Sequence, residues 1–293
     1  MNRQHFVGAS DAAAVMGMSP WKSRYALWAE KVHGVEATPP TEYIEWGNRL
    51  EPVISDRFHE WALANVEGFV GLTGDGKTTI TMPGFPFIAC TPDRYVLIGT
   101  DDRHLLEIKT TDGRNKDDWK HDPPLHYQIQ VQHQLLVTGL KVAWIAVLIG
   151  GNTFRVFRCN RNDRFIAALL RELQTFWSAV ETQTPPEIDG SDSTTAAIKA
   201  LHPNDTGETI ELGEDWIGPL ENLEMLKQSV LEHQKEIAAI ENRLREKIGD
   251  ATYAVIGDMV YSYKTVERKG YTVEPTTSRV LRRTKRKEST TNE

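Results

Sequence analysis

The chain has little cysteine and no long apolar run, and both shortages limit what it can be. Cys90 and Cys159 are its only two cysteines among 293 residues, which suits a reducing cytoplasm and cannot supply the usual four thiolates of an iron–sulfur cluster. It lacks the roughly 18 consecutive apolar residues that a membrane span needs, and its first ten residues lack the apolar core of a secretory signal. We therefore expect a cytoplasmic protein without a membrane segment.

An excess of positive charge is also missing. The formal net charge is −7, whereas proteins that bind nucleic acids are commonly basic. The charge is uneven, however, because residues 264–287 hold nine basic and two acidic side chains, which makes that segment +7 and the remainder −14. A local basic track can coexist with an acidic surface, so the overall charge does not exclude a nucleic-acid role.

A β-hairpin with charged side chains is the feature around which the sequence is organised. We expect strands over residues 94–98 and 104–110, joined by a turn at residues 99–102, whose Gly-Thr-Asp-Asp sequence is typical of turns. Side chains alternate between the faces of a strand, so Glu107 and Lys109 should point the same way.

Asp93 begins the first strand of this hairpin and should lie beside that charged face. Two carboxylates at such a distance repel each other unless a cation lies between them, and a hard divalent ion such as Mg²⁺ prefers oxygen ligands. A neighbouring lysine can stabilise developing negative charge or orient a water molecule. An exposed hairpin with an ordinary salt bridge between Glu107 and Lys109 is the alternative interpretation.

Two motifs carry a resemblance to a known family. Pro92-Asp93, thirteen residues and then Glu-Ile-Lys resemble the PD-(D/E)XK nuclease pattern. The stretch GASDAAAVMGMSPWKSRYALW, which starts at Gly8, resembles the opening of the YqaJ-type viral recombinases, which are phage exonucleases of the lambda-exonuclease kind. The resemblance covers residues 1 to about 182. It implies an α/β fold of the restriction-endonuclease-like type, with helices flanking a mixed central sheet and the charged hairpin at its centre.

The resemblance also implies a set of active-site residues. The family has a glutamate in a Gly-x-x-x-Glu pattern, which Gly47 and Glu51 match, and a glutamine on a later helix, which Gln130 matches. The residues it assigns to catalysis are Glu51, Asp93, Glu107, Lys109 and Gln130. It further implies two Mg²⁺ ions, for which Mn²⁺ can substitute, bound by Asp93, Glu107, the backbone carbonyl of Ile108 and, directly or through water, Glu51.

Three further residues are candidates for DNA contact. Arg3 and Ser10 have the spacing of the family's 5′-phosphate pocket, and a guanidinium with a hydroxyl suits a phosphate. The alternatives are that Ser10, with Asp11, simply caps a helix and that Arg3 is an unstructured terminal residue. Arg94 stands where the family often has glycine, and it either contacts a phosphate or packs.

The function implied by the resemblance is a metal-dependent 5′→3′ exonuclease. Such an enzyme digests linear double-stranded DNA and leaves 3′ single strands for a single-strand annealing recombinase, inside a bacterial or phage-infected cell. Family members can form homo-oligomers, including trimeric rings. Two alternatives stay open, which are a sequence-specific or structure-specific endonuclease of the same fold and a non-catalytic module that binds DNA ends or assists assembly.

The remaining patterns predict the domain organisation. Hydrophobic periodicity predicts helices over residues 41–64, 125–138 and 163–181, and a hairpin of strands over 141–149 and 153–159. A long helix over 220–248 has an apolar seam at alternating spacings of three and four, which is typical of a coiled coil but also of a helix lying on its own domain. We therefore expect an exonuclease domain over 1–182, a linker over 183–208 with one short helix, a C-terminal region over 209–288 and a disordered tail over 289–293.

Overall fold

The structure is a computed structural model that describes residues 3–35, 42–268, 270 and 279–283. The chain divides into two compact units, Met1–Pro203 and Asn204–Glu293, and each is described by itself. Among the described residues, no helix combines the length and the apolar character that crossing a membrane requires.

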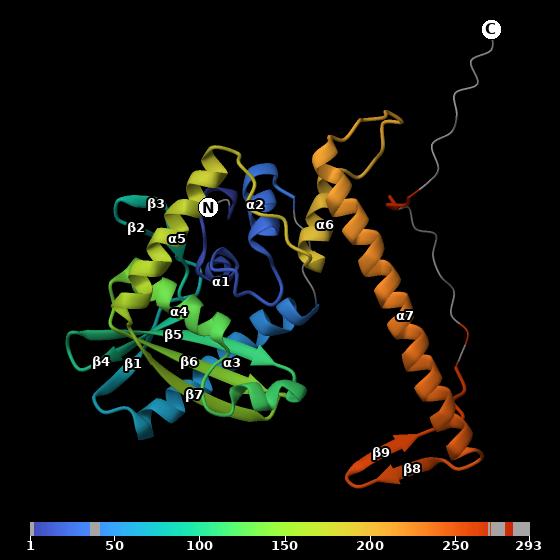
Figure 1. Cartoon of the computed structure of the whole chain (residues 1–293). Helices are drawn as coiled ribbons and strands as arrows, with labels where there is room; N and C mark the ends of the chain where they lie inside the picture. The colour runs from blue at the N-terminus through green and yellow to red at the C-terminus, as the bar shows by residue number, and fades with distance from the viewer. Residues whose placement is uncertain (1–2, 36–41, 269, 271–278, 284–293) are drawn as a thin grey trace. The chain divides into compact units, whose positions relative to one another are not determined.

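The centre of the first unit is a five-stranded mixed sheet (Figure 1). Its strands, in spatial order, are β1 (Phe69–Thr73), β4 (Arg94–Ile98), β5 (Asp102–Thr111), β6 (Val142–Ile149) and β7 (Thr153–Asn160). All neighbours are antiparallel except β5 and β6, which are parallel. The short strands β2 (Ile80–Met82) and β3 (Phe85–Cys90) form a separate antiparallel pair. The predicted hairpin therefore supplies β5, the central strand of the main sheet.

Helices cover both faces of this sheet (Figure 1). The helices are α1 (Ala12–Val15), α2 (Arg24–His33), α3 (Glu42–Asn65), α4 (Leu125–Thr138), α5 (Asp163–Glu181) and α6 (Asp192–Leu201), with short 3-10 turns η1 (Arg3–His5), η2 (Ala9–Asp11) and η3 (Gly113–Trp119). One core, on the side of α1, α2, α4 and α5, includes Leu105, whereas the other, under α3, includes Leu106. The α/β architecture predicted from the sequence is thus confirmed, with β5 and β6 buried on both sides.

Two local features depart from simple sequence preferences. Residues 113–119 form η3, which buries Trp119 against the rings of Tyr127 and Phe157. Burial of this large aromatic side chain favours the compact turn. Helix α3 begins at Glu42 and contains Pro52 in its interior.

The segment after α5 is packed rather than a free connector. Helix α6 lies against α2, where the backbone N–H of Ser23 donates to Ser193 Oγ at 2.9 Å and the hydroxyls of Ser23 and Thr194 are 2.7 Å apart. Ala197 is completely buried. The first unit therefore extends to Pro203, beyond the boundary at residue 182 that we expected.

The second unit consists of one long helix and a hairpin. Helix α7 (Ile217–Ile248) follows the 3-10 turn η4 (Glu214–Trp216), and β8 (Tyr253–Ile256) pairs with β9 (Met259–Ser262) at its C-terminal end (Figure 1). Ile248 is the one buried side chain among the unit's described residues. The coiled-coil seam on α7 stays a prediction. The tail 289–293 and most of the basic segment lie outside the described residues.

A histidine lies in the main core of the first unit without hydrogen-bonding partners. His133 on α4 is completely buried, and neither of its ring nitrogens makes a hydrogen bond within the described protein. Burial lowers the pKa of His133 to about 4, although the nearby Asp11 carboxylate opposes this shift. The folded protein therefore holds the ring neutral, whereas an unfolded histidine takes up a proton near pH 6.5.

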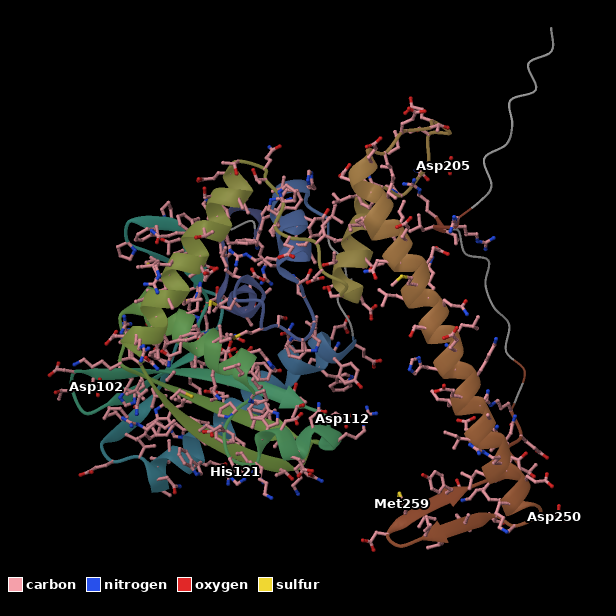
Figure 2. The ribbon with its side chains drawn as sticks, viewed as in Figure 1. Asp102, Asp112, His121, Asp205, Asp250 and Met259 are labelled. Atoms are coloured by element: carbon pink, nitrogen blue, oxygen red, sulfur yellow. The ribbon has the colours of Figure 1, made fainter. Side chains whose placement is uncertain are left out.

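We predict that acid weakens the first unit through His133. Because its pKa is lower in the folded state, the stabilisation is complete above about pH 6.5 and is lost as pH falls towards 4, which amounts to about 2 kcal/mol between pH 7.5 and pH 5. Urea unfolding at the two pH values should show that His133→Leu removes this part of the pH dependence. His121→Leu, at an exposed histidine (Figure 2), should not. Equal pH dependence in wild type and His133→Leu would contradict the assignment.

Candidate active site

The two halves of the PD-(D/E)XK pattern meet where β4 begins. Arg94 pairs with Leu106 in the β4–β5 ladder, so Asp93 lies opposite Glu107, just before β4 starts. The backbone N–H of Ile108 donates to Asp93 Oδ2 at 2.7 Å. Strand β5 continues beyond this point to Thr111, and Figure 2 shows Asp102 and Asp112 at its opposite ends. The short β4 therefore leaves the middle of β5 open for the Asp93 carboxylate.

Three donors hold the carboxylate of Glu107. Lys109 Nζ lies 2.6 Å from Glu107 Oε1, Gln130 Nε2 donates to the same oxygen at 2.5 Å, and Gln134 Nε2 donates to Oε2 at 2.6 Å. Alternation along β5 points Glu107 and Lys109 towards α4, and the spacing of four residues places both glutamines on one face of that helix. Glu107 is 2% exposed, so these three donors and the surrounding protein hold its carboxylate in one position.

The charges of this cluster are unbalanced. Burial, followed by the Glu107 charge, raises the pKa of Asp93 to about 8, although Lys109 opposes this shift. Burial disfavours the charged form of Lys109, but Glu107 and then Asp93 more than compensate and raise its pKa. One ammonium thus faces two carboxylates, and full ionisation of both requires another positive charge.

Glu51 reaches the same region from α3, where Arg94 holds it. Arg94 Nη1 donates to Glu51 Oε1 at 2.8 Å and to the backbone carbonyl of Asp93 at 2.5 Å. Gly76 packs against this pair at φ +70°, and a Cβ there would lie 3.1 Å from Glu51 Oε1 and 3.2 Å from the guanidinium. A glycine suits this close approach and backbone conformation. In this arrangement Arg94 links α3 to β4, and its contact with DNA stays a prediction.

Arg3 and Ser10, the two residues predicted to bind a 5′ phosphate, also lie in contact. Arg3 Nη2 donates to Ser10 Oγ at 2.8 Å and lies 3.4 Å from Asp11 Oδ1. Ser10 does not cap a helix, because it lies inside η2 and the residue at the N-cap of α1 is Asp11. Asp11 Oδ2 accepts the backbone N–H of Gly8 at 3.2 Å. The side chain of Lys31 is completely buried. It donates to Asp11 Oδ2 at 3.0 Å and to the backbone carbonyl of Arg3 at 2.7 Å. A buried ion pair therefore anchors the segment that carries the guanidinium and the hydroxyl.

Sequence reasoning left three residues out of the site. Gln134 is the first of them, although its spacing of four residues from Gln130 is the signal that predicts a shared target. Gly76 had no signal beyond a glycine-rich loop. Tyr127 lies with its ring centroid 5.1 Å from Lys109 Nζ, and its pattern in the sequence does not distinguish it from a core residue.

The donors at the site suit a hard divalent cation. Asp93 and Glu107 supply carboxylate oxygens, and a residue's N–H and C=O point to the same edge of a strand, so the Ile108 carbonyl faces the Asp93 side. Within the described parts of the chain no three His, Cys, Asp or Glu side chains gather as a metal cluster. Mg²⁺ does not need such a trio, because it is usually bound by one or two carboxylates, water and substrate phosphates. The residues therefore fit one such ion.

Solved structures similar to the chain include two exonucleases. The alkaline exonuclease LHK-Exo from Laribacter hongkongensis is 23% identical, with 62% of this chain and 90% of that chain covered and a TM-score of 0.49. A phage related exonuclease from Haemophilus somnus 129PT is 12% identical, with 61% and 94% covered and a TM-score of 0.45.

The site has the arrangement that its sequence pattern implies, and the sequence has relatives. The Asp and the Glu-x-Lys of the PD-(D/E)XK pattern meet across a hairpin in the centre of a mixed sheet flanked by helices. Residues 1–141 match the model of the YqaJ-like viral recombinase domain. The protein YqaJ of Bacillus subtilis (strain 168) is 27% identical over 272 residues, which cover 91% of this chain and 82% of that protein. Over residues 1–141 the chain is therefore similar to the YqaJ-like viral recombinase domain.

We predict that the buried Lys31–Asp11 pair is essential for the stability of the N-terminal segment. Burial opposes ionisation of Asp11, but Lys31, then Arg3 and Lys22, more than offset it and hold the Asp11 pKa below its usual value. Lys31→Met should lower the free energy of unfolding by about 3–5 kcal/mol, because the buried Asp11 carboxylate loses its buried cation and keeps only the longer pair with the exposed Arg3.

The matched control is Arg114→Met, whose guanidinium pairs with Asp112 but is 84% exposed. This surface pair should change the free energy of unfolding by less than about 1 kcal/mol. Urea unfolding followed by tryptophan fluorescence measures both variants. Equal losses in the two variants would show that burial of Lys31 has no special weight.

Proposed function

We propose that the first unit is a metal-dependent deoxyribonuclease that digests linear duplex DNA from its ends with 5′→3′ polarity. The observation that carries the proposal is the buried Glu107 carboxylate, held by Lys109 and Gln130 beside Asp93. A carboxylate fixed in this way next to a second one that cannot ionise freely is a site prepared for a cation and for negative charge on a substrate. The match of residues 1–141 to the YqaJ-like viral recombinase domain supports the same proposal.

The chemistry needs a hard cation together with the chain's own groups. Mg²⁺ or Mn²⁺ held by Asp93, Glu107 and the Ile108 carbonyl would supply an acidified water molecule and stabilise charge on the phosphate oxygens during an in-line displacement. Gln130 and Gln134 fix both oxygens of Glu107, so that the carboxylate cannot turn away from Asp93. Preorganised ligands of this kind reduce the reorganisation required during the reaction.

Lys109 has the role of a charge stabiliser. Its pKa is raised by Glu107 and Asp93, so the ammonium stays protonated and cannot act as a base at neutral pH. A protonated amine beside the scissile phosphate offsets the negative charge that develops at phosphorus and can orient the attacking water.

Arg3 and Ser10 are the groups that we assign to the 5′ end. Their side chains already touch, at 2.8 Å, and both are exposed, so a terminal phosphate can reach the guanidinium and the hydroxyl together. End recognition of this kind would select linear DNA and set the polarity. The resulting 3′ strands suit an annealing recombinase as partner, and a ring-shaped homo-oligomer would make digestion processive.

Two other functions compete with this proposal. An endonuclease of the same fold would cut closed circular DNA, and a non-catalytic module that binds DNA ends would cut neither form. The intact set of Glu51, Asp93, Glu107 and Lys109 favours catalysis over the second alternative. The Arg3–Ser10 contact favours end recognition over the first.

We predict digestion of linear duplex DNA in the presence of Mg²⁺ or Mn²⁺, with no cleavage of closed circular DNA and none with EDTA. Lys109→Ala should lower the rate about 100- to 1,000-fold, and Glu107→Gln, which keeps the side-chain shape but removes the charge, should be at least as severe. Release of acid-soluble nucleotides measures the rate, and circular dichroism establishes that each variant is folded.

A carboxylate control on the same protein is Glu60→Gln, since Glu60 lies exposed on α3 and pairs only with Arg57 among its described contacts. This variant should keep wild-type activity. A folded Lys109→Ala or Glu107→Gln protein with near-normal digestion would place the chemistry elsewhere in the molecule.

We predict faster digestion from 5′-phosphorylated ends than from 5′-hydroxyl ends. Arg3→Ala should shrink this preference, because the guanidinium supplies a charged hydrogen bond to the phosphate. Arg57→Ala, at an exposed arginine on α3, should leave the preference unchanged. Equal rates on both ends in the wild type would refute the end pocket while leaving the nuclease assignment intact.

A further inference from the structure

An exposed aromatic side chain lies next to the active site without a role in the chemistry described above. Trp21 is 65% exposed, which is unusual for the largest apolar side chain. Its ring centroid lies 4.5 Å from that of His126, with the planes nearly perpendicular, and 6.1 Å from that of Tyr127. The His126 and Tyr127 centroids are 4.1 Å apart. Three rings from two distant segments thus form one aromatic cluster.

This cluster is continuous with the active site. The ammonium of Lys109, which contacts Glu107, lies 5.1 Å from the Tyr127 ring centroid. Behind Tyr127 lies the buried Trp119, with centroids 5.3 Å apart. The Tyr127 ring therefore packs on the buried Trp119 and neighbours both Lys109 and the exposed Trp21.

The segment that carries Trp21 is held in place by its own hydrogen bonds. Ser19 Oγ accepts the backbone N–H groups of Trp21 at 3.3 Å and Lys22 at 3.1 Å. Ser23 then caps α2 by accepting the N–H of Ala26 at 3.0 Å, and it is tied to α6 through Thr194. The exposed ring is thus presented on a fixed turn, so little entropy is lost when a ligand contacts it.

We propose that Trp21, with His126 and Tyr127, forms a stacking platform for a nucleobase of the DNA strand whose phosphate lies at Lys109. This inference rests on the proposed function. A flat face of exposed indole accepts any base, because every base has a π-face, and such contacts are largely independent of sequence. A nuclease that digests an end regardless of sequence needs this kind of contact rather than hydrogen bonds to base edges.

The chemistry around the platform favours a base over an apolar protein segment. His126 and Lys109 give the cluster polar edges, and the phosphate site proposed at Lys109 fixes a nucleotide within reach of the rings. Burial, with a smaller effect of Lys109, lowers the pKa of His126, so its ring stays neutral and can contribute a flat, uncharged surface. Lys109 holds the phosphate, and the rings hold the base attached to it.

The test is a coupling experiment between a protein change and a DNA change. Trp21→Ala, Trp21→Phe and wild type are compared on linear duplexes that carry one abasic nucleotide at successive positions from the 5′ end, and on the same duplex without a lesion. Equilibrium binding is measured by fluorescence anisotropy with EDTA, and digestion is measured separately with Mg²⁺. Leu63→Ala serves as the control, because Leu63 is also 65% exposed but lies twelve residues beyond Glu51 on α3, about 18 Å along the helix.

We expect Trp21→Ala to weaken binding of intact DNA about tenfold, within the range known for a lost base–aromatic stack. At one abasic position, wild type and Trp21→Ala should bind equally, because the partner of the ring is already missing. Trp21→Phe should keep most of the affinity, and Leu63→Ala should bind as wild type on every duplex.

Two results would overturn the platform. Trp21→Ala could bind intact DNA as tightly as wild type, or it could lose the same factor on intact DNA and at every abasic position, which would mean that the ring contacts no base. The outcome is separate from that of the proposed function. If the wild type shows this coupling in binding but digests no DNA, the nuclease proposal is wrong and the platform proposal stands. If it digests DNA but shows no coupling, the platform proposal is wrong and the nuclease proposal stands.

Discussion

Burial of the Glu107 carboxylate is the constraint on which the arrangement of the first unit depends. A buried carboxylate without partners is strongly destabilising, and Glu107 sits at the centre of the central strand. Its two oxygens are satisfied by Lys109 from the same strand and by Gln130 and Gln134 from α4. Helix α4 therefore lies on that face of β5 with the two glutamines turned towards Glu107, and apolar residues of the same helix join the core there.

The same constraint explains why elements from both faces of the sheet converge at one point. Asp93 stands opposite Glu107 because β4 begins one residue later, and Arg94 then faces the other side, where Glu51 of α3 accepts its hydrogen bond. The alternation of side chains along β4 thus sends neighbouring residues to opposite layers. Asp93 and Arg94, which are neighbours in the chain, therefore connect the α4 side and the α3 side of the sheet through charged groups.

Local patterns were enough to predict most of the elements but not the contacts between distant segments. The predicted ranges of α4 and α5 coincide with the structure because their apolar spacing, the cap at Asn162 and the glycine at 139 all act within a few residues. The pairing of Glu107 with Lys109 followed from strand alternation alone. In contrast, α6 was assigned to a linker because its binding site is made by Ser23, far away in the sequence. The burial of Lys31 and Trp119 likewise depends on partners from other elements.

The charge of the first unit limits how the DNA recognition that we propose can work. Residues 1–203 hold 20 basic and 24 acidic side chains, a net charge of −4, so this unit as a whole has little long-range attraction for DNA. Electrostatic attraction there has to come from local cations such as Arg3 and Lys109. Stacking on uncharged rings does not depend on net charge and is not weakened by salt in the way that phosphate contacts are. A unit of small net charge that combines a few fixed cations with the aromatic platform that we propose would therefore hold a DNA end at ionic strengths at which a purely electrostatic surface would release it.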